Sequence, residues 1–253
     1  MNVDYDGITG KNATFEVGAH ISKAAVVFSE TTHNVTDFRS LTGETEELYY
    51  LMSLGQAQKY LYLAGISFDI VDETILSDKF QIRQYDLLIF NAMRYVPDKY
   101  AVEWRDNVRD LVRNEGLNII CVGELFSSNE YMQTRSPNTA YEVMLNTQFG
   151  TSASNSSIEL IAGNVSHGAA WRFTEGESIQ NYTQVYYQDV NVKSAALASF
   201  SVNPYRVYDR SKVAYGYPIL ATSNGKGRVI HSSLTDPLLE GGIMRDLALW
   251  AMY

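Results

Sequence analysis

The sequence contains a single cysteine, Cys121, among its 253 residues. One cysteine excludes an intramolecular disulfide framework and a zinc site built from several thiolates. Histidine is also scarce, and none of the four histidines lies in the H-E-x-x-H pattern of a metalloprotease helix: His20, His33, His167 and His231. We therefore predict no metal site and no cofactor, with ligands brought together from distant loops as the alternative.

Positive charge and long apolar runs are also in short supply. The chain carries 20 lysines and arginines against 29 aspartates and glutamates, which gives a formal net charge of -9. Nucleic-acid phosphates and anionic membranes bind clustered basic residues, so we predict neither as the main partner. No apolar run approaches the roughly 20 residues that cross a bilayer, so no membrane span is predicted.

The two ends of the sequence carry no targeting signal. The start, MNVDYDGITGKN, lacks the positive and apolar regions of a signal peptide. The end, LALWAMY, stops inside an apolar pattern that is typical of a helix. We therefore expect a domain cut from a longer protein. Its compartment is hidden in this fragment, and an extracellular or periplasmic one is favoured.

Short apolar runs alternate with helical patterns over the first half of the chain. Strands are predicted at 23–28, 67–72, 85–91 and 117–122. Helices are predicted from apolar residues at helical spacing, over 44–64 and 98–114. This order is typical of a parallel sheet covered by helices on both faces. We predict an α/β fold that is flavodoxin-like, with a doubly wound, mostly parallel sheet.

The second half of the chain is richer in polar residues. A loop is predicted over 126–157 with a short helix near 138–146, and strand-like stretches follow within 158–201. Strands at 217–223 and 227–234 flank Asn224-Gly225-Lys226, which is a strong hairpin signal, and a helix is predicted over 238–252. We predict one domain over 1–253, with its core in 20–125 and 217–253 and a β-rich insertion over about 126–216.

Two stretches carry a resemblance to a known family. They are YDLLIFNAMRYVPDKYAVEWRDNVRDLVRNEGLNIICVG and the tail YPILATSNGKGRVIHSSLTDPLLEGGIMRDLALWAMY. The first resembles the central strand, helix and glycine-ended strand of the class I glutamine-amidotransferase-like superfamily, in particular its ThuA-like and β-galactosidase-trimerisation-like branches. The tail is similar to the closing hairpin, strand and helix of that group. These motifs imply architecture much better than activity.

The catalytic pattern of that superfamily is missing. The resemblance implies a nucleophilic cysteine on the turn after the fourth strand, in a pattern like G-x-C-x-G, and a downstream His-x-Glu pair. Here Cys121 precedes the turn, inside the apolar run, and His231 is followed by two serines. A cysteine buried in apolar surroundings has a raised pKa and is a poor nucleophile. We therefore predict that glutaminase chemistry is absent.

Polar residues follow the predicted strands at the edge where doubly wound sheets bind ligands. They are Glu30, Asn91, Arg94, Glu124 and His231. One interpretation is a polar ligand cleft, with Glu124 where related enzymes keep a nucleophile. If the protein is an enzyme, Glu124, Glu30 and His231 are its predicted catalytic groups. The other interpretation is that these side chains solvate strand ends and cap helices.

Tyrosine is abundant, at 18 copies. Aromatic rings with a polar tip stack on sugars and also occur at protein interfaces. We predict a ligand-binding set formed by strand-end residues and second-half aromatics: Asn91, Arg94, Glu124, Trp171, Tyr186, Tyr187 and His231. Because the chain is acidic, its surface suits neutral or cationic glycans better than phosphorylated ones.

Three functional hypotheses remain open. The first is a non-catalytic accessory domain of a carbohydrate-active or exopolysaccharide-processing protein, which binds a polysaccharide or oligosaccharide or packs on a catalytic neighbour in a longer chain. The second is a hydrolase acting on a sugar or amide bond through the polar cleft. The third is a structural oligomerisation domain, which predicts an apolar surface patch and a stable oligomer.

Overall fold

Four apolar runs of the first half form adjacent parallel strands. The computed structural model describes residues 23–40, 46–135, 139–145, 148–160, 177–189, 195–198, 219–232, 248–249 and 251–252. The first half contains the strands β1 (Lys23–Phe28), β2 (Ser67–Asp72), β3 (Leu87–Asn91) and β4 (Asn118–Val122). Its helices are α1 (Glu30–Ser40), α2 (Glu46–Leu63), α3 (Lys79–Ile82) and α4 (Asp98–Asp110), with the short helical turns η1 (Glu73–Ser77) and η2 (Leu111–Glu115).

The second half adds strands to the same sheet and forms a separate ribbon. It contains the turn η3 (Tyr141–Leu145) and the strands β5 (Gln148–Leu160), β6 (Glu177–Asp189), β7 (Ala195–Ala198), β8 (Ile219–Asn224) and β9 (Gly227–Ser232). The main sheet has seven strands in the order β2-β1-β3-β4-β9-β8-β7. Its first five strands are parallel, while β8 runs antiparallel to β9 and β7 antiparallel to β8. The predicted mostly parallel, flavodoxin-like sheet is confirmed.

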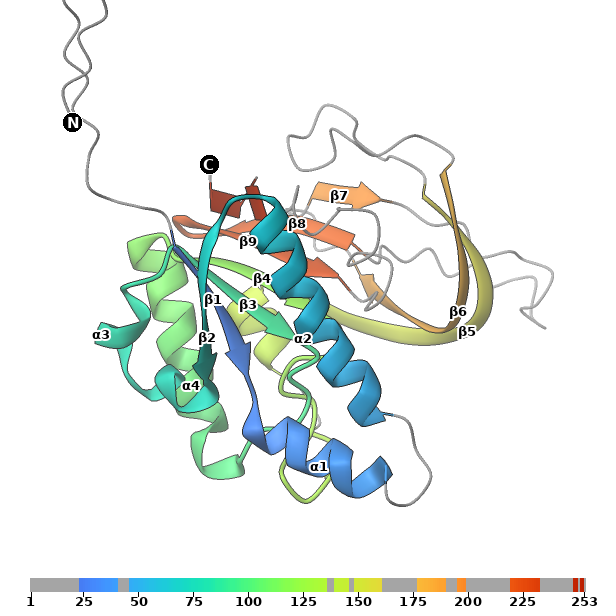
Figure 1. Ribbon diagram of the computed structural model, residues 1–253, viewed down its shortest axis with the longest axis horizontal. Helices are drawn as coiled ribbons and strands as arrows, with labels where there is room; N and C mark the ends of the chain where they lie inside the picture. Colours follow the sequence, from blue (N-terminus) through green and yellow to red (C-terminus); the bar gives the residue numbers. More distant parts are fainter. Residues whose placement is uncertain are drawn as a thin grey trace, which may run out of the picture.

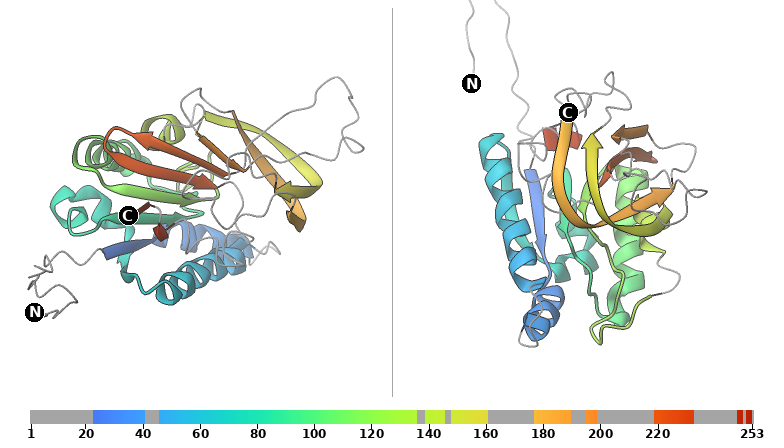
Figure 2. Two further views of the ribbon diagram at one scale, coloured as in Figure 1. Left: turned by 90° about the horizontal axis from the view of Figure 1, so that it is seen from above. Right: turned by 90° about the vertical axis from the view of Figure 1, so that its right-hand side faces the viewer.

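Helices cover both faces of this sheet, with α2 on one face and α4 on the other (Figures 1 and 2). Alternate residues of each strand supply two separate cores. Val26, Ile89 and Ile120 pack beneath α2. Val27 and Phe90 pack with Trp104 of α4 on the opposite face. Because both faces of β1, β3 and β4 are buried, these three strands appear in the sequence as nearly unbroken apolar runs.

The β8–β9 hairpin forms at the predicted Asn-Gly signal, and its glycines permit close packing. Gly225 has φ +70°, and a Cβ there would lie 2.3 Å from the carbonyl oxygen of Arg113 in η2. A Cβ on Gly227 would lie 2.2 Å from the carbonyl oxygen of Leu117. Asn224 accepts a hydrogen bond from Arg113 Nε at 2.7 Å. The Gly-Lys-Gly sequence is therefore a packed turn.

Several predicted boundaries differ from the structure. The 11-residue helix α1 follows β1 directly, and it was not predicted because its sequence, ETTHNVTDFRS, has few apolar residues at helical spacing. Strand β5 begins at Gln148, inside the segment predicted as a loop. Strands β5 and β6 pair antiparallel in their own two-stranded sheet. Of the predicted final helix, residues 248–249 and 251–252 are described and are helical.

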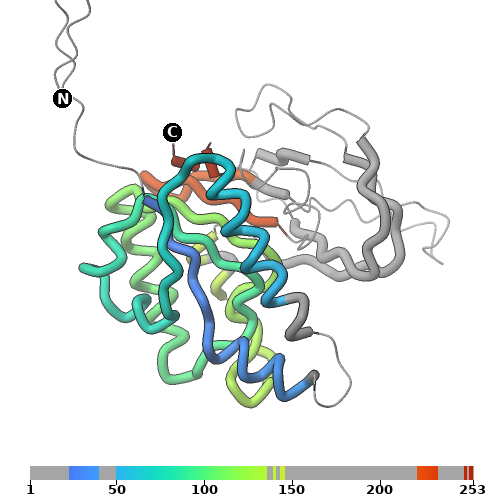
Figure 3. The backbone as a smooth tube through the Cα atoms, in the orientation of Figure 1, coloured from blue at the N-terminus to red at the C-terminus, as the bar shows by residue number. Residues whose placement is uncertain are grey.

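The carboxyl ends of the parallel strands lie at one edge of the sheet. Figure 3 follows the chain from β1 into α1 and from β4 into the loop after it, both at this edge. Ligands of doubly wound sheets bind at this edge, because the loops that follow the strands gather there. The residues at these strand ends are therefore the first candidates for a functional site.

Candidate functional site

Cys121 lies in the middle of the sheet and is fully buried. Its burial raises the pKa of the thiol far above its ordinary value. The nearest polar partner is the carbonyl oxygen of Gly123, 3.9 Å from Cys121 Sγ. The thiol is therefore protonated at neutral pH and shielded from solvent, as the sequence predicted, and it is unsuited to act as a nucleophile.

His231 does not join the groove that we predicted for it. It pairs in register with Cys121, and its side chain is buried. His231 Nε2 lies 3.2 Å from the carbonyl oxygen of Gly123. Burial lowers the pKa of His231 to about 4, so the ring is neutral at pH 7. Val229 of β9 packs on the α4 face and Ile89 of β3 packs on the α2 face. Strand alternation therefore directs His231 and Asn91, each two residues further along its strand, to opposite faces of the sheet.

Glu124 and Arg94 are brought together as expected of residues that follow neighbouring strands. Arg94 Nε lies 3.3 Å from Glu124 Oε2, and the Ser127 hydroxyl donates a hydrogen bond to the same oxygen. The guanidinium also lies 5.2 Å from the ring centre of Tyr95. Glu124 is thus an ion-paired carboxylate that helps to fix the turn after β4.

Glu30 does not contact this pair in the described residues. It is the first residue of α1 and its side chain is exposed. An acidic residue in the first helical turn interacts favourably with the positive end of the helix dipole. Of the three residues predicted to be catalytic in a hydrolase, Glu30 is therefore exposed, Glu124 is ion-paired and His231 is buried.

Asn91 is the most unusual polar residue at the edge. Its side chain is fully buried, and among the residues that the structure describes neither its amide oxygen nor its amide nitrogen has a hydrogen-bond partner. The next residue, Ala92, has φ +45°, and its N–H donates to the carbonyl oxygen of Val122 at 2.6 Å. A buried amide without partners destabilises the fold by about 1–3 kcal/mol. Such a group is often retained for a function.

A buried carboxylate that the sequence analysis overlooked caps helix α1. Ser29 precedes the helix, and its hydroxyl donates to Glu73 Oε2 at 2.5 Å. The backbone N–H and the hydroxyl of Thr31 both donate to Glu73 Oε1, at 3.0 and 2.5 Å. The hydroxyl oxygen of Tyr50 accepts from the Ser29 N–H at 2.7 Å. Burial raises the pKa of Glu73 above its ordinary value.

This network had a signal in the sequence. Asp72 ends the second predicted strand and Glu73 follows it, so these carboxylates could have been compared with the residues at the other strand ends. Ser29 followed three residues later by Thr32 fits a helix N-cap, because the Ser29 hydroxyl accepts from the Thr32 N–H at 3.0 Å. The network positions α1 at the carboxyl edge of the sheet.

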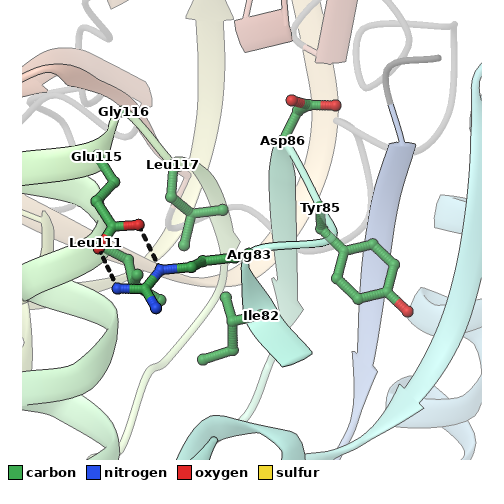
Figure 4. Close-up of a pocket in the computed structure, with 8 residues that line it drawn as sticks. All are labelled: Ile82, Arg83, Tyr85, Asp86, Leu111, Glu115, Gly116 and Leu117. Atoms are coloured by element: carbon green, nitrogen blue, oxygen red, sulfur yellow. Dashed lines mark hydrogen bonds and ion pairs between the residues drawn. The ribbon is translucent and has the colours of Figure 1, made fainter. Parts of the chain in front are cut away.

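A hollow of about 310 Å³ lies at the opposite edge, where strands β3 and β4 begin (Figure 4). Arg83 and Glu115 face each other in it through two hydrogen bonds of 2.6 Å. Tyr85 and Asp86 line the other side (Figure 4). Because it lies at the amino ends of the strands, this hollow is not at the ligand-binding edge of the fold. Its ion pair links the segment after α3 to η2.

The predicted aromatic residues are placed only in part. Trp171 lies outside the described residues. Tyr186 and Tyr187 lie in β6, whose backbone is described while its side chains are not. In the described residues, no group of three or more acidic, histidine or cysteine side chains is arranged to hold a metal ion. None of the described helices is long and apolar enough to cross a membrane.

No protein-family model matches this sequence. A search of curated proteins finds no match either. Solved structures do share the fold. The β-galactosidase from Rahnella sp. R3 aligns with a TM-score of 0.63 and 14% identity, over 90% of this chain and 30% of the enzyme.

Two further structures show the same likeness. The β-galactosidase from Bacillus circulans sp. alkalophilus gives a TM-score of 0.64 and 12% identity, over 90% of this chain and 30% of the enzyme. A ThuA-like protein from Bacteroides uniformis gives 0.58 and 16%, over 96% of this chain and 94% of its own. The chain thus spans about 30% of the length of these two β-galactosidases. The predicted resemblance is confirmed at the level of the fold.

Proposed function

We propose that this chain is a non-catalytic accessory domain of a longer, carbohydrate-active protein. The observation that carries the proposal is the state of the turn after β4. Cys121 is buried with a raised pKa, and Glu124 is engaged by Arg94 and Ser127. Neither group is available as a nucleophile, and His231 is a buried, neutral ring whose Nε2 lies against the carbonyl oxygen of Gly123.

Two observations support a polysaccharide or a catalytic domain as the partner: the structures that share the fold, and the acidic, tyrosine-rich composition of the chain. Two of the neighbours are β-galactosidases in which a segment of about 30% has this fold. A domain in that setting binds the polysaccharide substrate of its protein or packs on a catalytic neighbour. Residues 1–253 form one such domain in this proposal, and it acts outside the cell or in the periplasm.

Product analysis tests the non-catalytic part of this proposal. The wild-type chain is incubated with polysaccharides and with amide substrates, and new reducing ends and released ammonia are measured. We expect no product above a buffer control, and the same result for Glu124→Gln and Cys121→Ala. Product that is formed by the wild type and lost in Glu124→Gln would establish the hydrolase hypothesis instead.

A second candidate function, structural packing or oligomerisation, is favoured by the outer face of α2. This helix is apolar on both faces: Tyr50, Leu54 and Leu61 are buried against the sheet, while other large residues are exposed: Leu51, Met52, Tyr62 and Leu63. A helix that is apolar all round is normally buried. We therefore expect this outer face to be covered by a neighbouring domain or by a second copy of the chain.

Light scattering separates these two occupants. If a second copy covers α2, the chain is an oligomer that Met52→Glu or Leu63→Lys converts to a monomer. A matched control is Val102→Lys, because Val102 is an exposed apolar residue of α4. A wild-type monomer would exclude self-assembly through α2 and leave the neighbouring domain as its partner.

A further inference from the structure

A second hollow, of about 570 Å³, lies between α1 and the loop 126–135 at the carboxyl edge of the sheet. We call it the α1 hollow. Helix α1 contributes Val35 and Phe38 to its wall, and the loop contributes Tyr131 and Met132. The position matters because doubly wound folds bind ligands at this edge. Neither the strand-end residues nor the second-half aromatics predicted from the sequence belong to it.

Large apolar side chains stand exposed on both sides of the α1 hollow. The exposed fractions are 58% for Phe38, 72% for Tyr131 and 45% for Met132. Exposed aromatic rings on two facing elements form a surface that gains free energy when a ligand ring displaces water from it. A hollow of this kind is a candidate binding site, unlike a single exposed apolar residue.

The loop that carries Tyr131 and Met132 is held rigidly. Arg135 donates hydrogen bonds to the carbonyl oxygens of Ser128 and Val96, each at 2.7 Å, and pairs with Asp98 at 2.7 Å.

Asn129 fixes the tip of the same loop. Its side-chain oxygen accepts from the N–H groups of Tyr131 and Gln133, at 3.1 and 2.8 Å. Met132 has φ +64°, a strained conformation for a non-glycine residue. The backbone that carries these two side chains is thus held in place, so that a ligand would not have to order the loop on binding.

Polar groups complete the wall and set its charge. Thr31 and Asn34 of α1 and Glu130 of the loop line the hollow with hydroxyl, amide and carboxylate groups. Glu130 Oε2 accepts a hydrogen bond from the Asp98 N–H at 2.9 Å, which fixes its side chain. Among the described lining residues Glu130 alone is charged, and its charge is negative. A uronate or phosphorylated sugar would be repelled there.

We propose that the α1 hollow binds a pyranose ring that carries no negative charge, such as a neutral hexose or an amino sugar within a glycan. The apolar face of the ring lies against Phe38 and Tyr131, and its hydroxyl groups bond to Asn34, Thr31 and Glu130. This assignment rests on the proposed carbohydrate-binding function and gives that function a site.

The test compares the wall with matched exposed residues elsewhere. The wild type, Phe38→Ala and Tyr131→Ala are titrated with soluble β-1,4-galactan, a cello-oligosaccharide, partly deacetylated chitin oligosaccharides and polygalacturonate. The controls are Phe80→Ala on α3 and Val102→Ala on α4, whose side chains are 74% and 59% exposed. Thermal melts verify that every variant is folded, which is expected because all four side chains are exposed.

The outcomes separate the site from the function. We expect the wild type to bind at least one of the uncharged or amino-sugar ligands, and Phe38→Ala and Tyr131→Ala to weaken binding about tenfold or more. The two controls should change binding less than about twofold. If Phe38→Ala and Tyr131→Ala bind as the wild type does, the α1 hollow is not the site and the glycan-binding function stands. If the wild type binds none of the ligands, the glycan role fails together with the site.

Glu130→Gln tests the charge argument independently. Glutamine keeps an acceptor for the Asp98 N–H and removes the negative charge. We expect the wild type to discriminate against polygalacturonate and the variant to discriminate less. A wild type that prefers polygalacturonate would contradict the assignment of an uncharged or cationic ring.

Discussion

Asn91 shows how one side chain can be retained at the expense of stability. Both polar atoms of its buried amide lack hydrogen-bond partners within the described part of the chain. Replacement of such a group by an apolar side chain of similar shape removes a desolvation penalty. We expect Asn91→Leu to leave the free energy of unfolding unchanged or to raise it by about 1 kcal/mol, measured by urea denaturation.

Asn224 supplies the matched control for that prediction. It is also buried, but its amide accepts from Arg113 Nε and donates to the carbonyl oxygen of Met144. Asn224→Leu should therefore lower the free energy of unfolding by about 2–3 kcal/mol. An Asn91→Leu variant that loses as much stability as Asn224→Leu would mean that the Asn91 amide has partners in solution.

Glu73 gives the fold a pH dependence of defined sign. Burial places the pKa of its carboxyl above the ordinary value of 4.5, so the folded state binds the proton more tightly than the unfolded state does. The resulting stability is complete below the unfolded pKa and is lost as the pH rises through the folded pKa. The amide of Glu73→Gln cannot ionise and lacks this component.

The two proteins are compared by urea denaturation at intervals from about pH 4 to about pH 8. The free energy of unfolding of the wild type, minus that of Glu73→Gln, should fall as the pH rises. A difference that rises with pH would show that the hydrogen bonds from Ser29 and Thr31 outweigh burial and lower the pKa of the carboxyl.

At the scale of elements, the β8–β9 hairpin depends on the absence of side chains at its turn. Gly225 has φ +70°, and a Cβ there would overlap the backbone of Arg113. We expect Gly225→Ala to lower the free energy of unfolding by at least about 2 kcal/mol, through backbone strain and overlap. The control is Gly55→Ala in α2, where nothing lies within 4 Å of the added Cβ.

Gly55→Ala should stabilise the protein by about 0.5–1 kcal/mol, because alanine favours a helix more than glycine does. Thermal melts of both variants measure the pair of effects. Equal and small changes in the two variants would contradict the packing of the hairpin against η2.

The elements differ in how well the sequence predicted them, for physical reasons. Strands β1, β3 and β4 are buried on both faces, so their apolar runs identify them without knowledge of the rest of the chain. Helix α1 has few apolar residues at helical spacing. Its N-terminus is instead held by the carboxylate of Glu73, which lies 42 residues from Thr31 along the chain. A partner so distant in sequence was not visible in the local pattern.

The candidate site was predictable to the same limited extent. Strand ends located Asn91, Arg94 and Glu124 at one edge, because parallel strands end together. The direction of each side chain depends on strand alternation and on the exact register, and these bury His231 on the other side of the sheet. The α1 hollow joins a polar helix to a loop held by Arg135, and neither has a recognisable sequence motif.

At the scale of the whole molecule, the chain shares its fold with segments of two β-galactosidases. In the turn after β4, Cys121 is buried with a raised pKa and Glu124 is ion-paired with Arg94. The shared fold by itself does not establish a function. A domain with this architecture whose turn after β4 carries no available nucleophile can still bind a substrate for a catalytic neighbour. Binding and cleavage must therefore be measured on the same sample.

The most direct test is one experiment with the unmodified chain and a panel of soluble and insoluble polysaccharides. Protein retained on each polysaccharide and sugar released into each supernatant are measured together. The account predicts retention on at least one uncharged or amino-sugar polymer with no new product. Release of new sugar products would contradict the account, because the turn after β4 would then be catalytic, and an absence of retention on every polymer would remove its carbohydrate-binding role.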